Sequence, residues 1–517
     1  MASRLEWFPV FGFTEEQRLV VAPLSGTGSN RHAPPTHPSL PRAAMTWYHY
    51  VFIAAEVVSL ALVPVILLQR KEPTSTFAWI LTLIFLPILG TVLYLMFGRT
   101  TIREAGGPGV TSDADVAAPV PMAPDVAAAA ALRLERDCYR VAEILTGQAA
   151  TDGNHITVLI DGDETYAAIG AALDAACGTI HAEYYLIKDD AIGIWFAERL
   201  AAAAKRGVTV RLLRDGFGSF ALGSHWLAPL AAAGVMVRTF LPMHGFMLRP
   251  ASLRDHRKII VVDDRIAFTG GINICDEHSR LHFGATSWRD LHLRLEGPAV
   301  AQVQRIFGED WRFVTGENVL PASSARKIQE KHEPGAVRAA IIPSGPDTRT
   351  EAIHRVFFAA LAGAAREILI TSPYFAPDDA ILVAIEIASL RGVAVTLVVP
   401  AHSNHPTSQY AGRSLYQRLL DAGVRICEYQ PAMIHAKTML IDGRLALIGS
   451  ANMDLRSFRL NFEIHALIDH PAVVGRLRGF IDEVIADSRV VDPAQWNRRG
   501  VTARIAEGAA RLLSPLL

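Results

Sequence analysis

Long apolar runs near the start of this chain differ from the shorter, regularly broken runs that follow. Two runs, about Tyr48–Leu68 and Phe77–Phe97, contain Glu56 as their one charged residue. About 20 apolar residues cross the hydrocarbon core of a bilayer, so both runs are long enough. Two buried helices of a soluble core are the alternative, but such sustained runs are uncommon there. The pattern predicts a transmembrane hairpin joined by the polar QRKEPTST.

The segments around the hairpin are polar or of low complexity. Residues 1–44 lack a basic start followed by an apolar stretch, so we expect a disordered extension, with Met45 as an alternative start, rather than a signal peptide. The hairpin then occupies 45–98, and an Ala-, Gly-, Pro- and Asp-rich linker occupies 99–125. Basic residues before, within and after the hairpin nearly balance, so charge does not set its orientation.

Beyond the linker, short β-branched runs alternate with longer segments of helical spacing. VTVRLL, KIIVVD, EILITS and AVTLVV are typical of buried strands, whereas IGIWFAERLAAAAKRG and DDAILVAIEIASLRG are typical of helices that end at glycine. Alternating strand and helix units indicate an α/β fold. We therefore expect a mostly parallel sheet with helices on its faces.

One block of this pattern occurs twice without a gap. DHRKIIVVDDRIAFTGGIN (255–273) matches IHAKTMLIDGRLALIGSAN (434–452) after a shift of 179 positions. Farther on, WRDLHLRL matches NFEIHALI in the same order. The repeat predicts two similar halves, 126–330 and 331–517, packed about a pseudo-twofold axis.

The repeated block carries a histidine and a lysine two positions apart. On a strand these side chains share one face, where an ammonium group holds a phosphate and an imidazole attacks or donates a proton near neutral pH. Small-residue turns follow, each ending in an asparagine that can approach a ligand, and a carboxylate can fix a histidine tautomer. The candidate site residues are His256, Lys258, Asp263, His435, Lys437 and Asp442, supported by Asn273, Asn452, Asp290 and Glu463.

Other polar positions are weaker candidates. The acidic pair at 378 and 379 is best explained as a helix N-terminus. The histidines of AHSNHP (401–406) suit a solvated loop better than a pocket wall. His181 and Glu183 lie in a predicted strand. The pattern fits side chains that face the site and side chains that face the core equally well.

Composition narrows the chemistry. The formal net charge is −1, from 50 basic and 51 acidic residues, which argues against a sequence-independent nucleic-acid binder. Four scattered cysteines (Cys138, Cys177, Cys275 and Cys427) form no CxxC pair, so neither disulfides nor a zinc site is expected, and free thiols fit a reducing compartment. Walker-type, HExxH and GxSxG motifs do not occur. We expect no cofactor and no metal.

The paired HxKxxxxD motifs resemble the phospholipase D superfamily, and the wider pattern resembles bacterial cardiolipin synthases. AWILTLIFLPILGTVLYLMFG, WRDLHLRLEGPAV, IIPSGPD, SPYFAPD and GSANMDLRSFRLNFE support that branch. The resemblance covers about Met45 to Leu517, and the N-terminal extension departs from it.

The resemblance implies a membrane-bound phosphatidyltransferase that joins two phosphatidylglycerol molecules into cardiolipin and releases glycerol. By analogy His256 attacks the phosphodiester to form a phosphohistidine, and His435 is the general acid. The residues alone do not decide which of the two histidines is the nucleophile. Lys258 and Lys437 would hold the phosphate oxygens, and the motif aspartates would orient their motifs.

A phospholipase D hydrolase and a nuclease share these motifs and stay open as alternatives, as does a catalytically dead lipid-binding protein. The resemblance also implies a multi-pass protein of the bacterial inner membrane with its catalytic part on the cytoplasmic side. The sequence does not set the oligomeric state, the acyl preference or the exact phospholipid donor.

Overall fold

The computed structural model describes residues 47–68, 73–95, 124–242, 253–319, 337–346 and 350–514. By its contacts the chain divides into Met1–Val51 and Phe52–Leu517, and the β-sheet and both expected halves belong to the second unit. The expected disordered extension and nearly all of the expected linker lie outside the described residues. The proposed boundary between the halves, at 330, also lies outside them.

The first apolar run forms one continuous helix, α1 (Trp47–Leu68), and the second run does not. Within the described residues, His49–Leu68 alone is long and apolar enough to cross a membrane. The second run divides into α2 (Pro73–Phe85) and α3 (Pro87–Leu93) because Pro87 disfavours helical geometry at Leu86, which has φ −133° and ψ 65°. The Oγ of Ser59 in α1 donates to the carbonyl oxygen of Pro87 at 2.8 Å, which joins α3 to α1.

The remaining described elements follow in two sets. The N-terminal set is α4 Pro124–Thr146, β1 Thr151–Ile160, α5 Asp161–Ala175, β2 Thr179–Tyr184, α6 Ala191–Lys205, β3 Thr209–Asp215, α7 Ser224–Ala232, β4 Met236–Phe240, β5 Arg254–Asp255, β6 Lys258–Val262, β7 Ile266–Gly270, η2 Asp276–His278, α9 Arg280–Phe283, η3 Gly284–Thr286, β8 Leu291–Glu296 and α10 Ala299–Thr315.

The C-terminal set begins at residue 337. It is β9 Val337–Ser344, α11 Ala352–Gly363, β10 Glu367–Thr371, β11 Phe375–Ala376, α12 Asp379–Leu390, β12 Ala394–Pro400, α13 Pro406–Asp421, β13 Arg425–Tyr429, β14 Thr438–Ile441, β15 Leu445–Gly449, β16 Met453–Asp454, α14 Leu455–Arg459, β17 Asn461–Ile468, α15 Pro471–Ala486, β18 Ser488–Val490, α16 Pro493–Asn497 and α17 Val501–Leu512.

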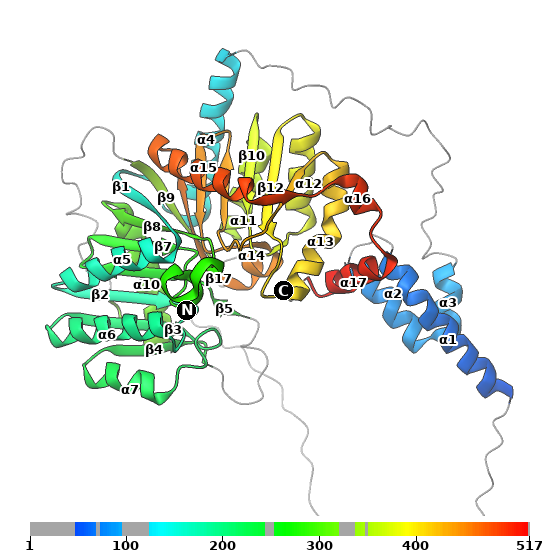
Figure 1. Ribbon diagram of the computed structural model, residues 1–517, viewed down its shortest axis with the longest axis horizontal. Helices are drawn as coiled ribbons and strands as arrows, with labels where there is room; N and C mark the ends of the chain where they lie inside the picture. Colours follow the sequence, from blue (N-terminus) through cyan, green and yellow to red (C-terminus); the bar gives the residue numbers. More distant parts are fainter. Residues whose placement is uncertain are drawn as a thin grey trace, which may run out of the picture. The chain divides into compact units, whose positions relative to one another are not determined.

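One sheet runs through both sets, and its order is mirrored at the β1–β9 pair (Figure 1). Outward from β1 come β8, β7, β6, β2, β3 and β4, and outward from β9 come β17, β15, β14, β10, β12, β13 and β18. Parallel pairing is confined to β2–β3–β4 and β10–β12–β13 within this path. The expected mostly parallel sheet is therefore wrong. Each repeated block forms an antiparallel hairpin, β6–β7 or β14–β15, instead of two strands joined by a helix.

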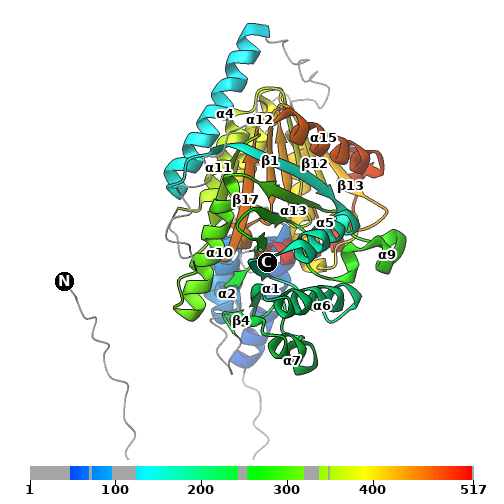
Figure 2. The same cartoon turned by 90° about the vertical axis from the view of Figure 1, so that its left-hand side faces the viewer.

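Helices lie on both sides of the sheet (Figure 2), and apolar clusters fill the space between them and the sheet, as continuous apolar strands require. In β6, Ile259 and Val261 belong to a cluster shared by the two halves, whereas Ile260 and Val262 face a cluster formed by the N-terminal half alone. The shared cluster includes Phe307 of α10 and Phe480 of α15. The halves are thus joined by hydrogen bonds and by a common core.

Candidate active site

The two motif histidines lie just before strands β6 and β14, and not within them as expected. The backbone N–H of His256 donates to the carbonyl oxygen of Phe462 at 2.9 Å, and that of His435 donates to the carbonyl oxygen of Arg289 at 2.7 Å. Arg254 and Asp255 of β5 also pair with β17 of the other half. Each histidine is therefore held by the half to which it does not belong.

The side chains of the histidines are paired across the halves in the same way. Nδ1 of His256 donates to Oε2 of Glu463 at 3.0 Å, and Nδ1 of His435 donates to Oδ2 of Asp290 at 2.6 Å. All four residues are buried. A carboxylate at Nδ1 keeps the proton there, which leaves Nε2 of each ring as the nitrogen that can react.

Both lysines reach the same region. The Nζ of Lys258 donates to the carbonyl oxygen of His256 at 2.6 Å. The Nζ of Lys437 donates to that of His435 and lies 3.9 Å from Oδ2 of Asp290. Burial lowers the pKa of Lys258 to about 7 and that of Lys437 to about 8, although nearby carboxylates oppose the shift. In the free protein these ammonium groups release protons easily.

The histidines are neutral in the free protein. Burial lowers the pKa of His256 to about 4, against the opposing charge of Glu463. Burial also lowers the pKa of His435 far below its usual range, and the charges of Lys437 and Lys258 lower it further. Glu463 stays ionised, because His256 and Lys258 hold its pKa at about 2 although burial alone would raise it. The mutual influence of these groups indicates one site, built from both halves.

The two histidine–carboxylate pairs differ in their supports. Glu463 accepts hydrogen bonds from Oγ of Ser450 at 2.5 Å and from Nδ2 of Asn461 at 3.1 Å. The equivalent of Ser450 in the other half is Gly271, where an added Cβ would lie 2.2 Å from Oδ1 of Asp290. Asp290 instead accepts the backbone N–H of Leu291 at 2.7 Å. The pseudo-equivalent sites are therefore chemically distinct.

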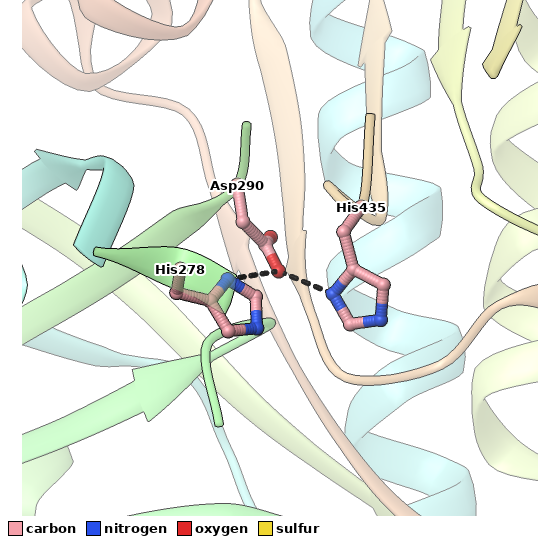
Figure 3. A group of neighbouring side chains, drawn as sticks. All are labelled: His278, Asp290 and His435. Carbon is pink, nitrogen blue, oxygen red and sulfur yellow. Dashed lines mark hydrogen bonds and ion pairs between the residues drawn. The ribbon is translucent and has the colours of Figure 1, made fainter. Parts of the chain in front are cut away.

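His278, which the sequence pattern does not single out, lies beside the second pair (Figure 3). Its Nδ1 is 4.0 Å from Oδ2 of Asp290, and its ring centre is 5.2 Å from that of His435. Both ring nitrogens are buried and lack a hydrogen-bond partner among the described residues. No signal in the repeat reveals His278, because it lies in a segment that is longer between Asn273 and Asp290 than its counterpart in the other half.

Among the described residues, one group of side chains could hold a metal ion. It consists of His278, Asp290 and His435. Their donor atoms lie within 4.8 Å of one another, and two imidazoles with a carboxylate suit zinc. Binding a cation there would break the 2.6 Å hydrogen bond between Asp290 and His435, beside the ammonium group of Lys437. The donors fit an acid–base pair better than a resident metal.

Asp263 and Asp442 directly follow β6 and β14, at the opposite end of each strand from the motif lysine. The carboxylate of Asp263 accepts the backbone N–H groups of Cys177, Gly178 and Thr179 at 2.9, 2.7 and 2.7 Å. Asp442 accepts those of residues 365–367. These contacts anchor each motif to the start of β2 or β10, away from the histidines.

The predicted asparagines are buried, and the side-chain oxygens of Asn273 and Asn452 have no hydrogen-bond partner among the described residues. The backbone carbonyl of Asn273 accepts the hydroxyl of Tyr166 at 2.6 Å. The backbone N–H of Asn452 donates to Oγ of Ser457 at 3.1 Å. Within the described residues, the hydrogen-bonding capacity of these two buried oxygens is therefore unused.

The structure places the weaker candidates at a helix cap, in an exposed loop and in the core. Asp378 caps α12 by accepting the N–H of Ile381, as predicted for a helix N-terminus. His402 and His405 are exposed, as predicted for a loop. His181 faces the core, where its ring stacks on Phe307.

Glu183 takes part in a separate buried network beside the site. It lies next to Asp255, which precedes His256, and burial raises the pKa of Glu183 far above its usual range. Asp255, Asp310 and Arg257 all act on this carboxyl group.

Comparison with known proteins supports a single family. A model described as "Cardiolipin synthase, PLD-like domain" matches residues 169–311 and 357–485, one segment in each half. A second, "Phospholipase_D-nuclease N-terminal", matches residues 57–99.

Curated relatives match nearly the whole chain. A cardiolipin synthase of Geobacillus kaustophilus is 37% identical over 485 residues, which cover 90% of this chain and 93% of that protein. Cardiolipin synthase 2 of Bacillus cereus is 37% identical over 461 residues, covering 88% and 89%.

Among solved structures, phosphatidylserine synthase of Haemophilus influenzae Rd KW20 shares the fold. Its TM-score is 0.56 at 13% identity, and the match covers 73% of this chain and 99% of that one. The crossed histidine–carboxylate pairs, the matched segments in both halves and the near full-length relatives lead to one conclusion: the chain belongs to the cardiolipin synthases of the phospholipase D superfamily.

Proposed function

We propose that this protein makes cardiolipin by transferring a phosphatidyl group from one phosphatidylglycerol molecule to a hydroxyl group of a second, with release of glycerol. The observation that carries the proposal is the crossed pairing of His256 with Glu463 and of His435 with Asp290. It leaves two reactive Nε2 atoms in one site with two lysines. That set suits displacement at a phosphodiester through a covalent intermediate.

In the first step, Nε2 of His256 attacks phosphorus and forms a P–N bond as the P–O bond to glycerol breaks. The departing alkoxide takes a proton from Nε2 of His435. The negative charge of the bound phosphodiester raises the pKa of His435, which is lowered in the free protein, and so supports its protonated form. Lys258 and Lys437 stabilise the charge on the non-bridging oxygens.

In the second step, a hydroxyl group of the second phosphatidylglycerol loses its proton to Nε2 of His435. Its oxygen attacks phosphorus, the P–N bond breaks, and cardiolipin leaves with His256 neutral again. His256 is assigned as the nucleophile because Glu463 has more donors than Asp290, remains firmly ionised and keeps the proton on Nδ1. The family analogy gives the same assignment.

The membrane arrangement is part of the proposal. The long apolar α1 and the Ser59 contact with α3 support a hairpin with two passes, in which the Leu86 break interrupts the second. Four free cysteines favour the cytoplasmic side of the bacterial inner membrane for the catalytic part. The mirrored strand order about β1–β9 supports a pseudo-twofold arrangement of the halves.

A phospholipase D hydrolase would use the same residues, with water as the acceptor. Burial of both histidines favours the transferase, because a closed site limits the approach of water. The test is to reconstitute the purified protein in phosphatidylglycerol bilayers and separate the lipid products. We expect cardiolipin and free glycerol in equal amounts, whereas phosphatidic acid alone would identify a hydrolase.

A further inference from the structure

The turn between β3 and α7, residues 216–222, is held rigidly by buried polar groups. The buried carboxylate of Asp215 accepts the backbone N–H groups of Phe217 and Gly218, both at 2.8 Å. The Oγ of Ser219 donates to the carbonyl oxygen of Tyr185 at 2.9 Å and accepts the N–H of Ile187 at 3.0 Å. The backbone of the turn therefore has little freedom to rearrange.

This rigid turn nevertheless presents two aromatic side chains to solvent. Phe217 is 53% exposed and Phe220 is 72% exposed, while Ser219 between them is fully buried. Local relaxation cannot bury the rings without breaking the contacts of Asp215 and Ser219. Exposed aromatic groups on a fixed scaffold are typical of surfaces that contact an apolar partner.

The turn is directly connected to the proposed reaction centre. Oδ2 of Asp215 also accepts the backbone N–H of Asp255, the residue before His256, at 3.0 Å. The ring of Tyr185 lies 4.8 Å from that of His256, and its centre is 5.5 Å from Nζ of Lys258. The backbone of the turn is thus linked through Asp215 and Tyr185 to the residues around the reacting groups.

Cationic groups accompany the aromatic ones. The guanidinium of Arg254 lies 5.1 Å from the ring centre of Phe217. Arg254 and Arg456, one from each half, act electrostatically on each other and on Tyr185, and Asp215 offsets part of the charge of Arg254. Arg254 is buried, so the half-buried Arg456 is the member of this pair that can approach an anionic headgroup.

We propose that residues 216–222 form an interfacial loop, in which Phe217 and Phe220 insert into an anionic phospholipid bilayer and bring the entrance of the site to the lipid surface. The proposal deepens the proposed function, because a phosphatidyl group must leave the bilayer to reach His256. The apolar helices anchor the chain, whereas this loop would orient the catalytic part toward its substrate.

Insertion can be measured without turnover. In full-length protein with Cys177→Ser, the remaining three cysteines are buried, so Phe220→Cys accepts a polarity-sensitive fluorophore. We expect a blue-shifted emission and strong quenching by lipids with spin labels near the headgroups, in vesicles containing phosphatidylglycerol. The same fluorophore at Leu390, 69% exposed at the end of α12, should stay unquenched. Equal or absent quenching at the two positions would overturn the proposal.

A second measurement separates insertion from other roles. The double variant Phe217→Ser/Phe220→Ser should lose about tenfold in kcat/KM on vesicles, since two apolar contacts are removed. It should retain turnover of a dispersed short-chain phosphatidylglycerol within about twofold. The matched control Phe358→Ser, at an exposed position of α11, should match the wild type on both substrates.

The other possible occupants give different results. Equal losses on the two substrates would show that the rings hold the substrate or the site, and would reject insertion. A blue shift that grows with the protein-to-lipid ratio, without quenching by the spin-labelled lipids, would show that a second copy of the chain covers the two rings. Quenching measured in the His256→Ala protein tests insertion independently of the reaction. In the wild type, lipid insertion without cardiolipin formation would refute the proposed function alone.

Discussion

Glu463 holds Nδ1 of His256 from 207 positions away in the sequence, across the junction between the halves. Replacing this carboxylate by an amide in Glu463→Gln lets the amide donate to Nδ1, which moves the ring proton to Nε2 and blocks attack. We expect kcat to fall by roughly 10³-fold with little change in folding, and Asp290→Asn to have a comparable effect through His435. Cardiolipin formation in vesicles measures both.

The matched control is Asp264→Asn, which changes an exposed acid outside the pairs and should leave kcat within about twofold. Near-normal turnover in either Glu463→Gln or Asp290→Asn would contradict the crossed-pair mechanism.

The covalent intermediate offers a test of the assignment of the nucleophile. Rapid quenching of protein mixed with phosphorus-labelled phosphatidylglycerol should give an acid-labile label on the peptide that contains His256. His256→Ala should abolish the label. A label on the peptide that contains His435 would reverse the two roles.

The difference between Gly271 and Ser450 predicts unequal effects of the same new side chain. Alanine at Gly271 would place Cβ 2.2 Å from Oδ1 of Asp290 and push the carboxylate away from His435. We expect Gly271→Ala to lower kcat more than about 100-fold and Ser450→Ala, which removes one hydrogen bond to Glu463, about tenfold. Equal effects would mean that the supports of the two pairs do not matter.

The motif aspartates should matter for stability more than for chemistry. Asp263→Asn keeps the left-handed backbone (φ 53°) accessible but removes the charge that three N–H groups face, at a cost of about 2 kcal/mol. Chemical denaturation of detergent-solubilised protein measures this difference, and kcat of the folded protein should change less than about threefold.

The effect of Asp263 also has a predictable pH dependence. Burial opposes ionisation, but the backbone N–H groups lower the pKa of Asp263 in the folded state. Its contribution is therefore present above the unfolded pKa of about 4 and is lost as the pH falls through the folded value. The stability difference between the wild type and Asp263→Asn should shrink in acid, and a constant difference would exclude the charge as its source.

The lysines predict that anion binding takes up protons. Lys258 and Lys437 have pKa values of about 7 and 8 in the free protein, so at pH 8 both are partly neutral. A bound phosphodiester anion raises both pKa values, and its affinity should fall as the pH rises from about 7 through about 8. Calorimetry with dimethyl phosphate in buffers of different ionisation enthalpy should detect the uptake. Lys437→Arg, which stays charged, should take up fewer protons, and uptake identical to that of the wild type would exclude Lys437 as a source.

The sequence predicts the residue types of the candidate site, and is less informative about which half supplies the carboxylate for each histidine. The gap-free repeat identified both histidines, and the matching carboxylates were expected to fix a ring proton. Pairing within a half and pairing across halves fit that pattern equally well. The crossing depends on long-range backbone contacts, such as that of His435 with Arg289, which local periodicity does not encode.

The expected parallel sheet is wrong, and the turn inside each repeated block carries a local signal against it. Asp263 and Asp264, and likewise Asp442 and Gly443, all have positive φ, which is the geometry of a two-residue hairpin turn. The alternation of strands and helices along the chain predicts parallel pairing, whereas these short turns favour antiparallel hairpins. Pro87 was a similar signal for a break in the second apolar run, whereas His278 has no local signal at all.

The shared anchoring of His256 and His435 has a consequence for an enzyme diluted in a membrane. Two separate molecules would have to meet in the bilayer before either histidine gained its carboxylate, and dilution would disfavour their encounter. Here the partner half is tethered in the same chain, so its effective concentration does not depend on how many copies the membrane holds. Catalytic competence then becomes a property of each single molecule, even where the protein is scarce.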